Sequence, residues 1–247
     1  MIDLGELDAA LGKLAALRGR PVLLVHGRID DDVPRLVRPG PVDLVLSTLG
    51  GSPTAAARVA AVLADYRVLV PARARSAGTL LCLGASELVL TPLAELGPLD
   101  PLVEPPGGRP VSAADVRAFR AVAAGFGVPA GPELLGLLCQ RVAPTALARL
   151  HRLDGLVRAL ATRQLDRHHP AADVAALVDQ LVAGYPDHDY PIFRAEAREL
   201  GLPVTDATAA ELAALGAVTA AAEAVLAAAA DVGTPLTTLV RSEEAPA

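Results

Sequence analysis

Two glycine-containing turns, each placed after an apolar run, carry the residue types that acyl transfer needs. Gly50-Gly51 follows the run 44–49, and Ser76-Ala77-Gly78 follows the run 68–70 after a short connection. Together the turns offer a serine hydroxyl as nucleophile and bare backbone N–H groups as donors to one reacting carbonyl. A candidate general base, His188, lies far downstream in the chain.

Each turn has a structural and a chemical interpretation. Ser76 opens a helix, where serine is a common N-cap residue, but the same position presents free N–H groups that would stabilise an oxyanion. Gly50-Gly51 is either a strand-to-helix turn or an oxyanion hole, in which one donor contributes about 3 kcal/mol to the transition state. Because Ala77 is small and Gly78 has no side chain, a substrate backbone could approach closely there.

The elements that must position these residues alternate between strands and helices. Short apolar runs predict strands over 21–26, 42–48, 67–70 and 87–91. Ser52-Pro53 predicts the start of a helix, with serine at the N-cap and proline at the first helical position, and 76–85 predicts a buried helix. Strand–helix–strand alternation with short connections predicts an α/β fold with a parallel sheet and right-handed crossovers.

The pattern changes after residue 103. Breaker residues over 104–110 predict a loop, and most of the chain beyond that loop is helical in pattern. Helical signals cover 113–184 (with one helix over 145–164), 193–200 and 207–230. We therefore expect an α/β core over 1–103 and a mainly helical portion over 104–247 that continues the same domain, with 241–247 as a flexible tail.

Four groups of residues, in this order, resemble the serine dehydrogenase proteinase family. They are Thr48-Leu49-Gly50-Gly51, Ser76-Ala77-Gly78-Thr79, the segment 95–101 (Glu-Leu-Gly-Pro-Leu-Asp-Pro), and 188–192 (His-Asp-Tyr-Pro-Ile) followed by Glu196-Ala197 and Leu200-Gly201-Leu202. The family is a bacterial branch of the Clp protease/crotonase superfamily, related to the Clp proteolytic subunit and signal peptide peptidase A. The resemblance covers roughly residues 20–205.

The resemblance implies a Clp-like fold of stacked ββα units, usually oligomeric, and a serine peptidase that works through an acyl-enzyme on Ser76. It implies that the amides of Gly51 and Ala77 are the oxyanion donors and that Gly50 shapes the turn. It also implies that the segment 96–103 lies near the active cleft and that the substrate is a peptide or protein.

The motifs do not identify the general base that would take the proton from Ser76. Lys13, the only lysine, precedes the first strand and belongs to no matching motif, and arginine does not deprotonate in this pH range. A serine–lysine dyad is therefore not expected. The chain also has no histidine between Ser76 and His151, whereas in the Clp proteolytic subunit a histidine follows the nucleophile within a few tens of residues.

We prefer His188 as the base because Tyr190-Pro191 restricts its loop. Adjacent Asp187 and Asp189 could orient the imidazole and stabilise its charged form. The alternative is an exposed or helix-capping histidine, and the competing histidines are His26 at a strand end, His151 on a leucine-rich helix and the pair His168-His169.

Two further carboxylates have two interpretations each. Asp100 could contact the histidine or the substrate in the cleft, or it could serve the turn before Pro101. Glu95 could act in the cleft, cap a helix or pair with an arginine.

Composition narrows the function classes. A net charge of −6 and an aromatic content of 2% argue against nucleic acid as the main partner. We expect no membrane segment, because we find no uncharged apolar stretch of sufficient length and the N-terminus lacks a basic signal-peptide region, so we expect a cytoplasmic protein. Cys82 and Cys139 suggest buried thiols, and no cofactor or metal ion is expected.

Two other functions share these features. A crotonase-like acyl-CoA hydratase or hydrolase would use the same fold and oxyanion hole, with carboxylates over the thioester and a basic site for the CoA phosphates. A non-catalytic assembly or adaptor protein would keep the fold and use the helices over 113–184 and 207–230 for contacts.

Overall fold

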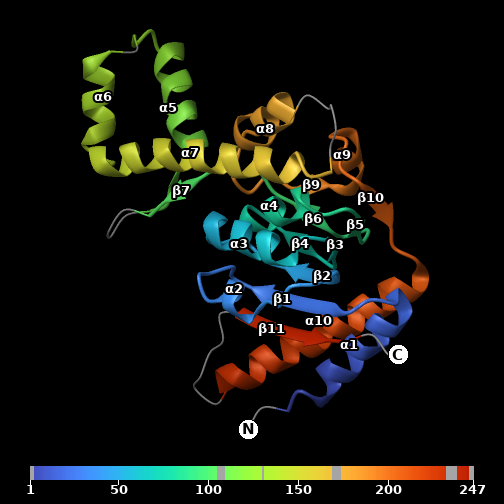
Figure 1. Ribbon diagram of the computed structural model, residues 1–247. Helices are drawn as coiled ribbons and strands as arrows, with labels where there is room; N and C mark the ends of the chain where they lie inside the picture. The colour runs from blue at the N-terminus through green and yellow to red at the C-terminus, as the bar shows by residue number, and fades with distance from the viewer. Residues whose placement is uncertain (1–2, 105–108, 130, 169–173, 232–237, 245–247) are drawn as a thin grey trace.

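A six-stranded sheet forms the centre of the protein in the computed structural model, which describes residues 3–104, 109–129, 131–168, 174–231 and 238–244 (Figure 1). The strand order is β10-β5-β3-β2-β1-β11, and every pair is parallel except β1 with β11. The strands are β1 Val22–Gly27, β2 Val42–Ser47, β3 Tyr66–Val70, β5 Leu88–Leu90, β10 Val204–Asp206 and β11 Thr238–Glu243. The four expected strands and their parallel arrangement are confirmed.

Helices cover both faces of this sheet, which is why its central strands are continuous apolar runs. One buried cluster lies between the sheet and α1 and α10, and a larger one lies on the side of α3, α4, α7 and α8. The helices are α1 Gly5–Arg18, α2 Val33–Leu36, α3 Pro53–Leu63, α4 Ala77–Leu83, α5 Ala113–Gly125, α6 Pro132–Cys139, α7 Pro144–Leu165, α8 Val174–Ala183, α9 Arg194–Glu199 and α10 Ala209–Asp231. As expected, Ser52 caps α3 by accepting the Ala55 N–H at 3.2 Å.

A second, smaller sheet lies beside the carboxyl ends of the main strands. It pairs β4 (Arg73–Ala74) in parallel with β6 (Glu95–Leu96), and β6 in antiparallel fashion with β9 (Ile192–Phe193). The succession β3, β4, α4 is one of the expected ββα units. Because β9 joins this sheet, the segment around residue 188 is carried next to the turn that precedes α4.

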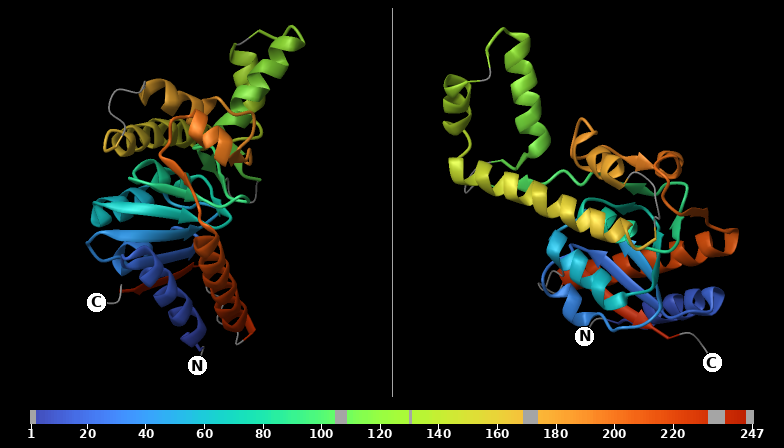
Figure 2. Two further views of the ribbon diagram at one scale, coloured as in Figure 1. Left: turned by 90° about the vertical axis from the view of Figure 1, so that its right-hand side faces the viewer. Right: turned by 45° about the horizontal axis from the view of Figure 1, so that its top comes forward.

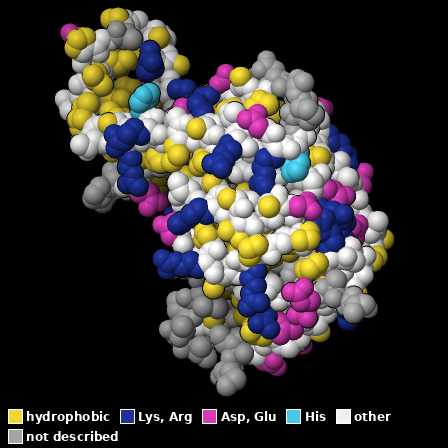
Figure 3. Space-filling view, in the orientation of Figure 1, with side chains coloured by type: hydrophobic (Ala, Val, Ile, Leu, Met, Phe, Trp, Pro, Cys, Tyr) yellow, Lys and Arg dark blue, Asp and Glu magenta, His cyan; other side chains and the backbone are white. Residues whose placement is uncertain are grey.

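Two helices stand away from the body. We call residues 113–143 the arm; it contains α5 and α6, joins the first half of α7, and projects to one side (Figures 1 and 2). It follows a short hairpin of β7 (Leu102–Val103) and β8 (Val111–Ser112). Hydrophobic side chains gather on its surface in the space-filling view (Figure 3), among them Phe126, which is 84% exposed.

Three expectations need correction or restriction. Residues 241–243 are not a flexible tail, because they belong to β11, where Arg241 pairs with Leu24 of β1 and bonds the Asp8 carboxylate through two nitrogens at 2.7 Å. Residues 105–108 of the expected loop, and 245–247, lie outside the described residues. Of the two free cysteines, Cys82 is buried but Cys139 is only half-buried.

Helix α10 is long and apolar enough to cross a membrane, judged by length and composition alone. This differs from the expectation that no stretch of the chain would be. Leu215, Val218 and Val225 of α10 pack with α1 in the core beneath the sheet, and a third of its most apolar window is buried. In this structure the helix is therefore part of the packed core.

A buried arginine links α1 to two strands of the main sheet and to α10. Arg18, at the end of α1, donates to Asp43 of β2 at 2.5 Å and to Glu87, just before β5, at 2.8 Å. It also bonds Glu211 in the first turn of α10. The side chains of Arg18 and Asp43 are 10% and 0% exposed, so both charges depend on this network for compensation.

We predict that Arg18→Met lowers the free energy of unfolding by about 3–5 kcal/mol, because it leaves the buried Glu211 carboxylate without its cation and leaves Asp43 with Arg20 alone, at 3.6 Å. Urea denaturation measures the change. The matched control is Arg35→Met, which removes an exposed pair with Asp32 and should cost less than about 1 kcal/mol. Equal losses in the two variants would contradict this description of the network.

Candidate active site

The two glycine-containing turns meet in space. At the end of β2 the Thr48 N–H donates to the Arg73 carbonyl at 2.9 Å, and the Arg75 N–H donates back to the Thr48 carbonyl at 3.1 Å. A Cβ atom on Gly50 would lie 3.0 Å from Ser76 Cβ. The turn after β2 therefore lies directly against Ser76, as expected if both turns serve one reacting carbonyl. A side chain at position 50 would displace Ser76, so only glycine fits there.

The first turn is held by backbone bonds that leave one amide unused. The Ile29 N–H donates to the Gly50 carbonyl at 3.0 Å, and the Gly50 N–H donates to Thr48 Oγ1 at 2.9 Å. Gly51 has φ +146°, and a Cβ there would lie 2.1 Å from the Ile29 carbonyl oxygen. Among the described residues, neither the Gly51 N–H nor the Ala77 N–H donates a turn or loop hydrogen bond, so both remain available to a ligand oxygen.

Ser76 has an unusual backbone and an unused hydroxyl. Its φ of 51° and ψ of −112° are strained for a residue with a side chain, and such strain concentrates at functional sites. Although Ser76 occupies the N-cap of α4, its side chain makes no capping hydrogen bond. The structural alternative, a helix-capping serine, therefore lacks the hydrogen bond that defines it.

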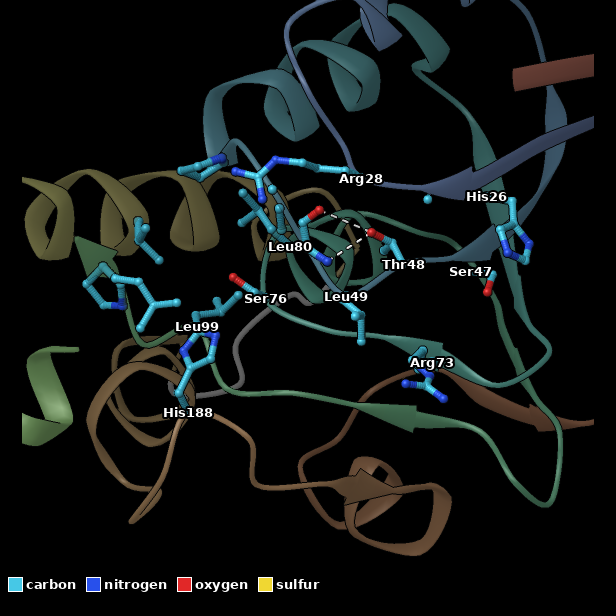
Figure 4. A pocket seen from close by; sticks show the side chains of 18 of the residues that line it. His26, Arg28, Ser47, Thr48, Leu49, Arg73, Ser76, Leu80, Leu99 and His188 are labelled. Atoms are coloured by element: carbon cyan, nitrogen blue, oxygen red, sulfur yellow. Dashed lines mark hydrogen bonds between the residues drawn. The ribbon is translucent and has the colours of Figure 1, made fainter. Parts of the chain in front are cut away.

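A backbone carbonyl orients His188. Its Nδ1 lies 2.9 Å from the Asp100 carbonyl oxygen, and because a carbonyl can only accept, Nδ1 must carry the proton. In the neutral ring this leaves Nε2 as the proton acceptor. His188 lines the same cavity as Ser76, and Figure 4 shows the imidazole on the Ser76 side of that cavity.

The loop that carries His188 is internally braced. The rings of Tyr185 and Tyr190 stack with centroids 4.7 Å apart. The Asp189 N–H donates to Asp187 Oδ1 at 2.8 Å, and the Tyr190 N–H donates to the Asp187 carbonyl at 3.2 Å. These contacts, with the proline at 191, give the loop the restricted shape that the sequence predicts.

The Asp100 carboxyl is buried behind the histidine. Its Oδ1 accepts the Ala114 N–H at 3.0 Å and an Arg117 nitrogen at 3.2 Å, both from α5. Burial raises the pKa of this carboxyl, while Ser112, Arg117 and the Ala114 N–H favour its charged form. The Asp100 side chain thus binds the first turns of α5, while the backbone carbonyl of the same residue accepts the hydrogen bond from His188.

The other candidate carboxylates do not reach the imidazole. Asp189 is exposed, and its Oδ1 lies 2.9 Å from Arg75 Nη1. Glu95 also binds Arg75, with Oε1 2.7 Å from Nη2. The interpretation of Glu95 as a partner of an arginine is confirmed, and the structure places the Asp189 carboxylate on Arg75 rather than on His188.

One cavity of 890 Å³ contains Ser76 and His188 (Figure 4). Its apolar lining includes Leu80, Leu99 and Val157. Its polar lining includes Arg28, which lies beside Leu80 in Figure 4, and His26, Ser47 and Arg73 on the other side of Thr48. The cavity therefore offers a ligand both apolar and charged side chains in the same space as Ser76.

The competing bases lie elsewhere. His26 lines the cavity at its far end, next to Ser47 in the labelled view (Figure 4), and burial lowers its pKa. His151, on α7, lines a separate hollow between α5, α6 and α7, while His168 and Lys13 are exposed. His169 lies outside the described residues. Of the described histidines, His188 is the one placed on the Ser76 side.

Several supporting residues escape sequence reasoning. Thr48 caps the Gly50 turn through its hydroxyl, which a threonine two residues before a glycine could have signalled. Thr79 joins the helix that follows Ser76 to the segment 95–101: its Oγ1 accepts the Gly97 N–H, and its single proton lies between the Ala74 and Gly97 carbonyl oxygens, each 2.8 Å from Oγ1. The carbonyl of Asp100 carries no signal at all, because any residue supplies one.

Part of the chain matches a known protein family. Residues 30–117 match the family of ClpP-like SDH-type serine proteinases. The matched segment includes Gly51, Ser76 and Asp100 and ends before His188. The match confirms the family resemblance and the Clp-like α/β fold over the segment that holds the nucleophile candidate.

Two proteins of Methanocaldococcus jannaschii are similar over a longer stretch. "Uncharacterized protein MJ0137" is 33% identical over 168 residues, which cover 66% of this chain and 53% of that protein. "Uncharacterized protein MJ1495" is 27% identical over 168 residues, which cover 66% of this chain and 52% of that protein. The chain thus spans about half the length of the curated relatives it matches.

We predict that Gly51→Ala destabilises the protein by about 1–3 kcal/mol, because the new Cβ would collide with the Ile29 carbonyl. Urea denaturation measures the change. The matched control is Gly155→Ala in α7, where a Cβ meets nothing within 4 Å; there alanine should stabilise the helix by up to about 1 kcal/mol. A Gly51→Ala protein as stable as the control would contradict the close approach to Ile29.

Proposed function

We propose that this chain, whose residues 30–117 match the family of ClpP-like SDH-type serine proteinases, is a serine peptidase that cleaves peptide bonds through an acyl-enzyme on Ser76. The observation that carries the proposal is the uncapped hydroxyl of Ser76 on a strained backbone. It lies against Gly50 and in one cavity with an imidazole whose Nδ1 is already bonded. A helix-capping role does not explain the uncapped hydroxyl.

The residues suit the steps of acyl transfer. Ser76 Oγ attacks the scissile carbonyl carbon while its proton passes to Nε2 of His188, which the Asp100 carbonyl holds through Nδ1–H. The oxygen of that carbonyl takes the negative charge and accepts hydrogen bonds from the Gly51 and Ala77 amides. His188 then gives its proton to the departing amine. In the second half, water attacks the ester and its proton passes through His188 back to Ser76 Oγ.

Asp100 contributes in this scheme through its backbone. Its carbonyl fixes the tautomer and the ring orientation of His188, the part that a carboxylate plays in a serine–histidine–aspartate triad. Its buried carboxyl fastens that carbonyl to α5 through Ala114 and Arg117. The Asp100 side chain is therefore a support for the base rather than a proton carrier.

We expect a fluorophosphonate probe to label Ser76, and Ser76→Ala to abolish the label. His188→Ala should slow labelling by about 10²–10⁴-fold, the usual contribution of a general base. Peptide mass mapping locates the label, and its rate is followed by gel fluorescence. The control His151→Ala, in the separate hollow between α5, α6 and α7, should label at the wild-type rate.

If Ser76 is labelled equally fast without His188, the proposal of a serine hydrolase stands, but His188 is not its general base. A folded protein that takes no label would favour the non-catalytic assembly function. That alternative has an observation of its own, because the arm exposes Val122, Phe126 and Leu137 over 53–84% of their surface.

We also propose that the chain forms a homo-oligomer through the arm, with a second copy of the chain as the partner. The hollow between α5, α6 and α7 measures 590 Å³ and is lined by apolar side chains such as Phe119, Leu134 and Leu150. The same arm carries the exposed Phe126. Two copies related by a two-fold axis can bury such apolar surface against each other.

The double variant Phe126→Asp/Leu137→Asp should shift the mass of the protein in solution towards the monomer, because it places charge in an apolar contact. Light scattering after size-exclusion chromatography measures the mass. The control Leu93→Asp alters a side chain that is 82% exposed outside the arm and should leave the mass unchanged. An oligomer that survives the double variant would contradict an arm contact.

A further inference from the structure

Arg75 links the loop of the candidate nucleophile to the loop of the candidate base. It immediately precedes Ser76, and its guanidinium group binds two carboxylates. Nε and Nη2 bind Glu95 Oε1 at 2.8 and 2.7 Å, and Nη1 binds Asp189 Oδ1 at 2.9 Å. Asp189 is the neighbour of His188, so one side chain joins the residues adjacent to both candidate catalytic groups.

The Arg75 side chain is oriented before it meets Asp189. A Cβ on Gly97 would lie 3.1–3.4 Å from Arg75 Cγ, Cβ and Cα, so the absent side chain of Gly97 makes room for the arginine. The side chain of Arg75 is only 20% exposed, and that of Glu95 19%. Asp189, by contrast, is 79% exposed. A fixed fork therefore holds an otherwise exposed carboxylate in one position.

We propose that Arg75 is a positioning residue, which keeps His188 in reach of Ser76 by clamping Asp189 onto the nucleophile loop. The effect on catalysis rests on the proposed function, whereas the link that Arg75 makes between the Ser76 loop and the His188 loop does not. It accounts for Glu95 and Asp189, two carboxylates that lie close to the site and touch neither Ser76 nor the imidazole. It also accounts for an arginine at 75, since a lysine offers no fork for two carboxylates.

The clamp and an ordinary surface ion pair have different consequences. An exposed pair contributes little to stability, so its removal should barely move the thermal midpoint. A displacement of about 1 Å between catalytic groups, however, can cost up to about 10²-fold in rate. A clamp therefore affects the covalent step much more than it affects folding or ligand binding.

The experiment measures the rate of covalent labelling (kinact) and the probe's binding constant (KI) separately, with a fluorophosphonate. Arg75→Gln and Asp189→Asn should each lower kinact about tenfold with KI unchanged. The double variant should be no slower than the slower single variant, because both changes remove the same link. Asp189→Glu, which keeps the carboxylate, should recover part of the rate. The matched control is Arg241→Gln, which breaks the two-nitrogen bond to Asp8 elsewhere on the molecule and should change neither constant.

Amide hydrogen exchange of residues 186–191 tests the clamp without any chemistry. Exchange there should be faster in Arg75→Gln and Asp189→Asn than in Arg241→Gln, with thermal midpoints within about 3 °C of each other. Wild-type kinact in both single variants, or losses that multiply in the double variant, would overturn the proposal. If the wild-type protein takes no label, the proposed function has failed, and unchanged exchange over 186–191 would then overturn the clamp separately.

Discussion

The structure depends on the close approach of two backbone turns with no side chain between them. Gly50 lies against Ser76 Cβ, and Gly51 lies against the Ile29 carbonyl, so both positions exclude every residue but glycine. Ser76 in turn adopts φ 51° and ψ −112°, a strain of about 1–3 kcal/mol. The backbone bonds through Thr48 and Arg73 hold the turns together and offset that strain. The result is a hydroxyl and two unused amides in one place.

The second sheet extends this arrangement to a residue more than a hundred positions away in the chain. β4 leads to Ser76, β6 leads to Asp100, and β9 follows His188, and these three short strands are hydrogen-bonded neighbours. Strand pairing therefore sets the distance between the three loops. Arg75 and the Asp100 carbonyl act at a finer scale, because they fix the loops that the strands bring together. The arm enters at the same point through Arg117 and Ala114.

Local patterns predict most of the main sheet and the position of Ser76. Apolar runs bounded by glycine and proline indicate β1, β2, β3 and β5, and the strand-to-turn placement indicates both glycine turns. The β11 pairing escapes such reasoning, because six residues of mixed polarity become a strand only through long-range contact with β1. Local patterns also fail to predict the hydrogen-bond partner of His188. The adjacent aspartates suggested a carboxylate, whereas the partner is a backbone carbonyl 88 residues away. Sequence proximity is a poor guide to hydrogen bonding, because neighbouring side chains on a loop point in different directions.

The central claim is that Ser76, His188 and the Gly51 and Ala77 amides converge on one reacting atom. The structure of the protein after reaction with diisopropyl fluorophosphate tests this most directly. The account predicts phosphorus bonded to Ser76 Oγ, with one phosphoryl oxygen accepting hydrogen bonds of about 2.7–3.1 Å from both amides and with His188 Nε2 beside the adduct. An unreacted Ser76, or an adduct whose phosphoryl oxygen points away from Gly51 and Ala77, would contradict it.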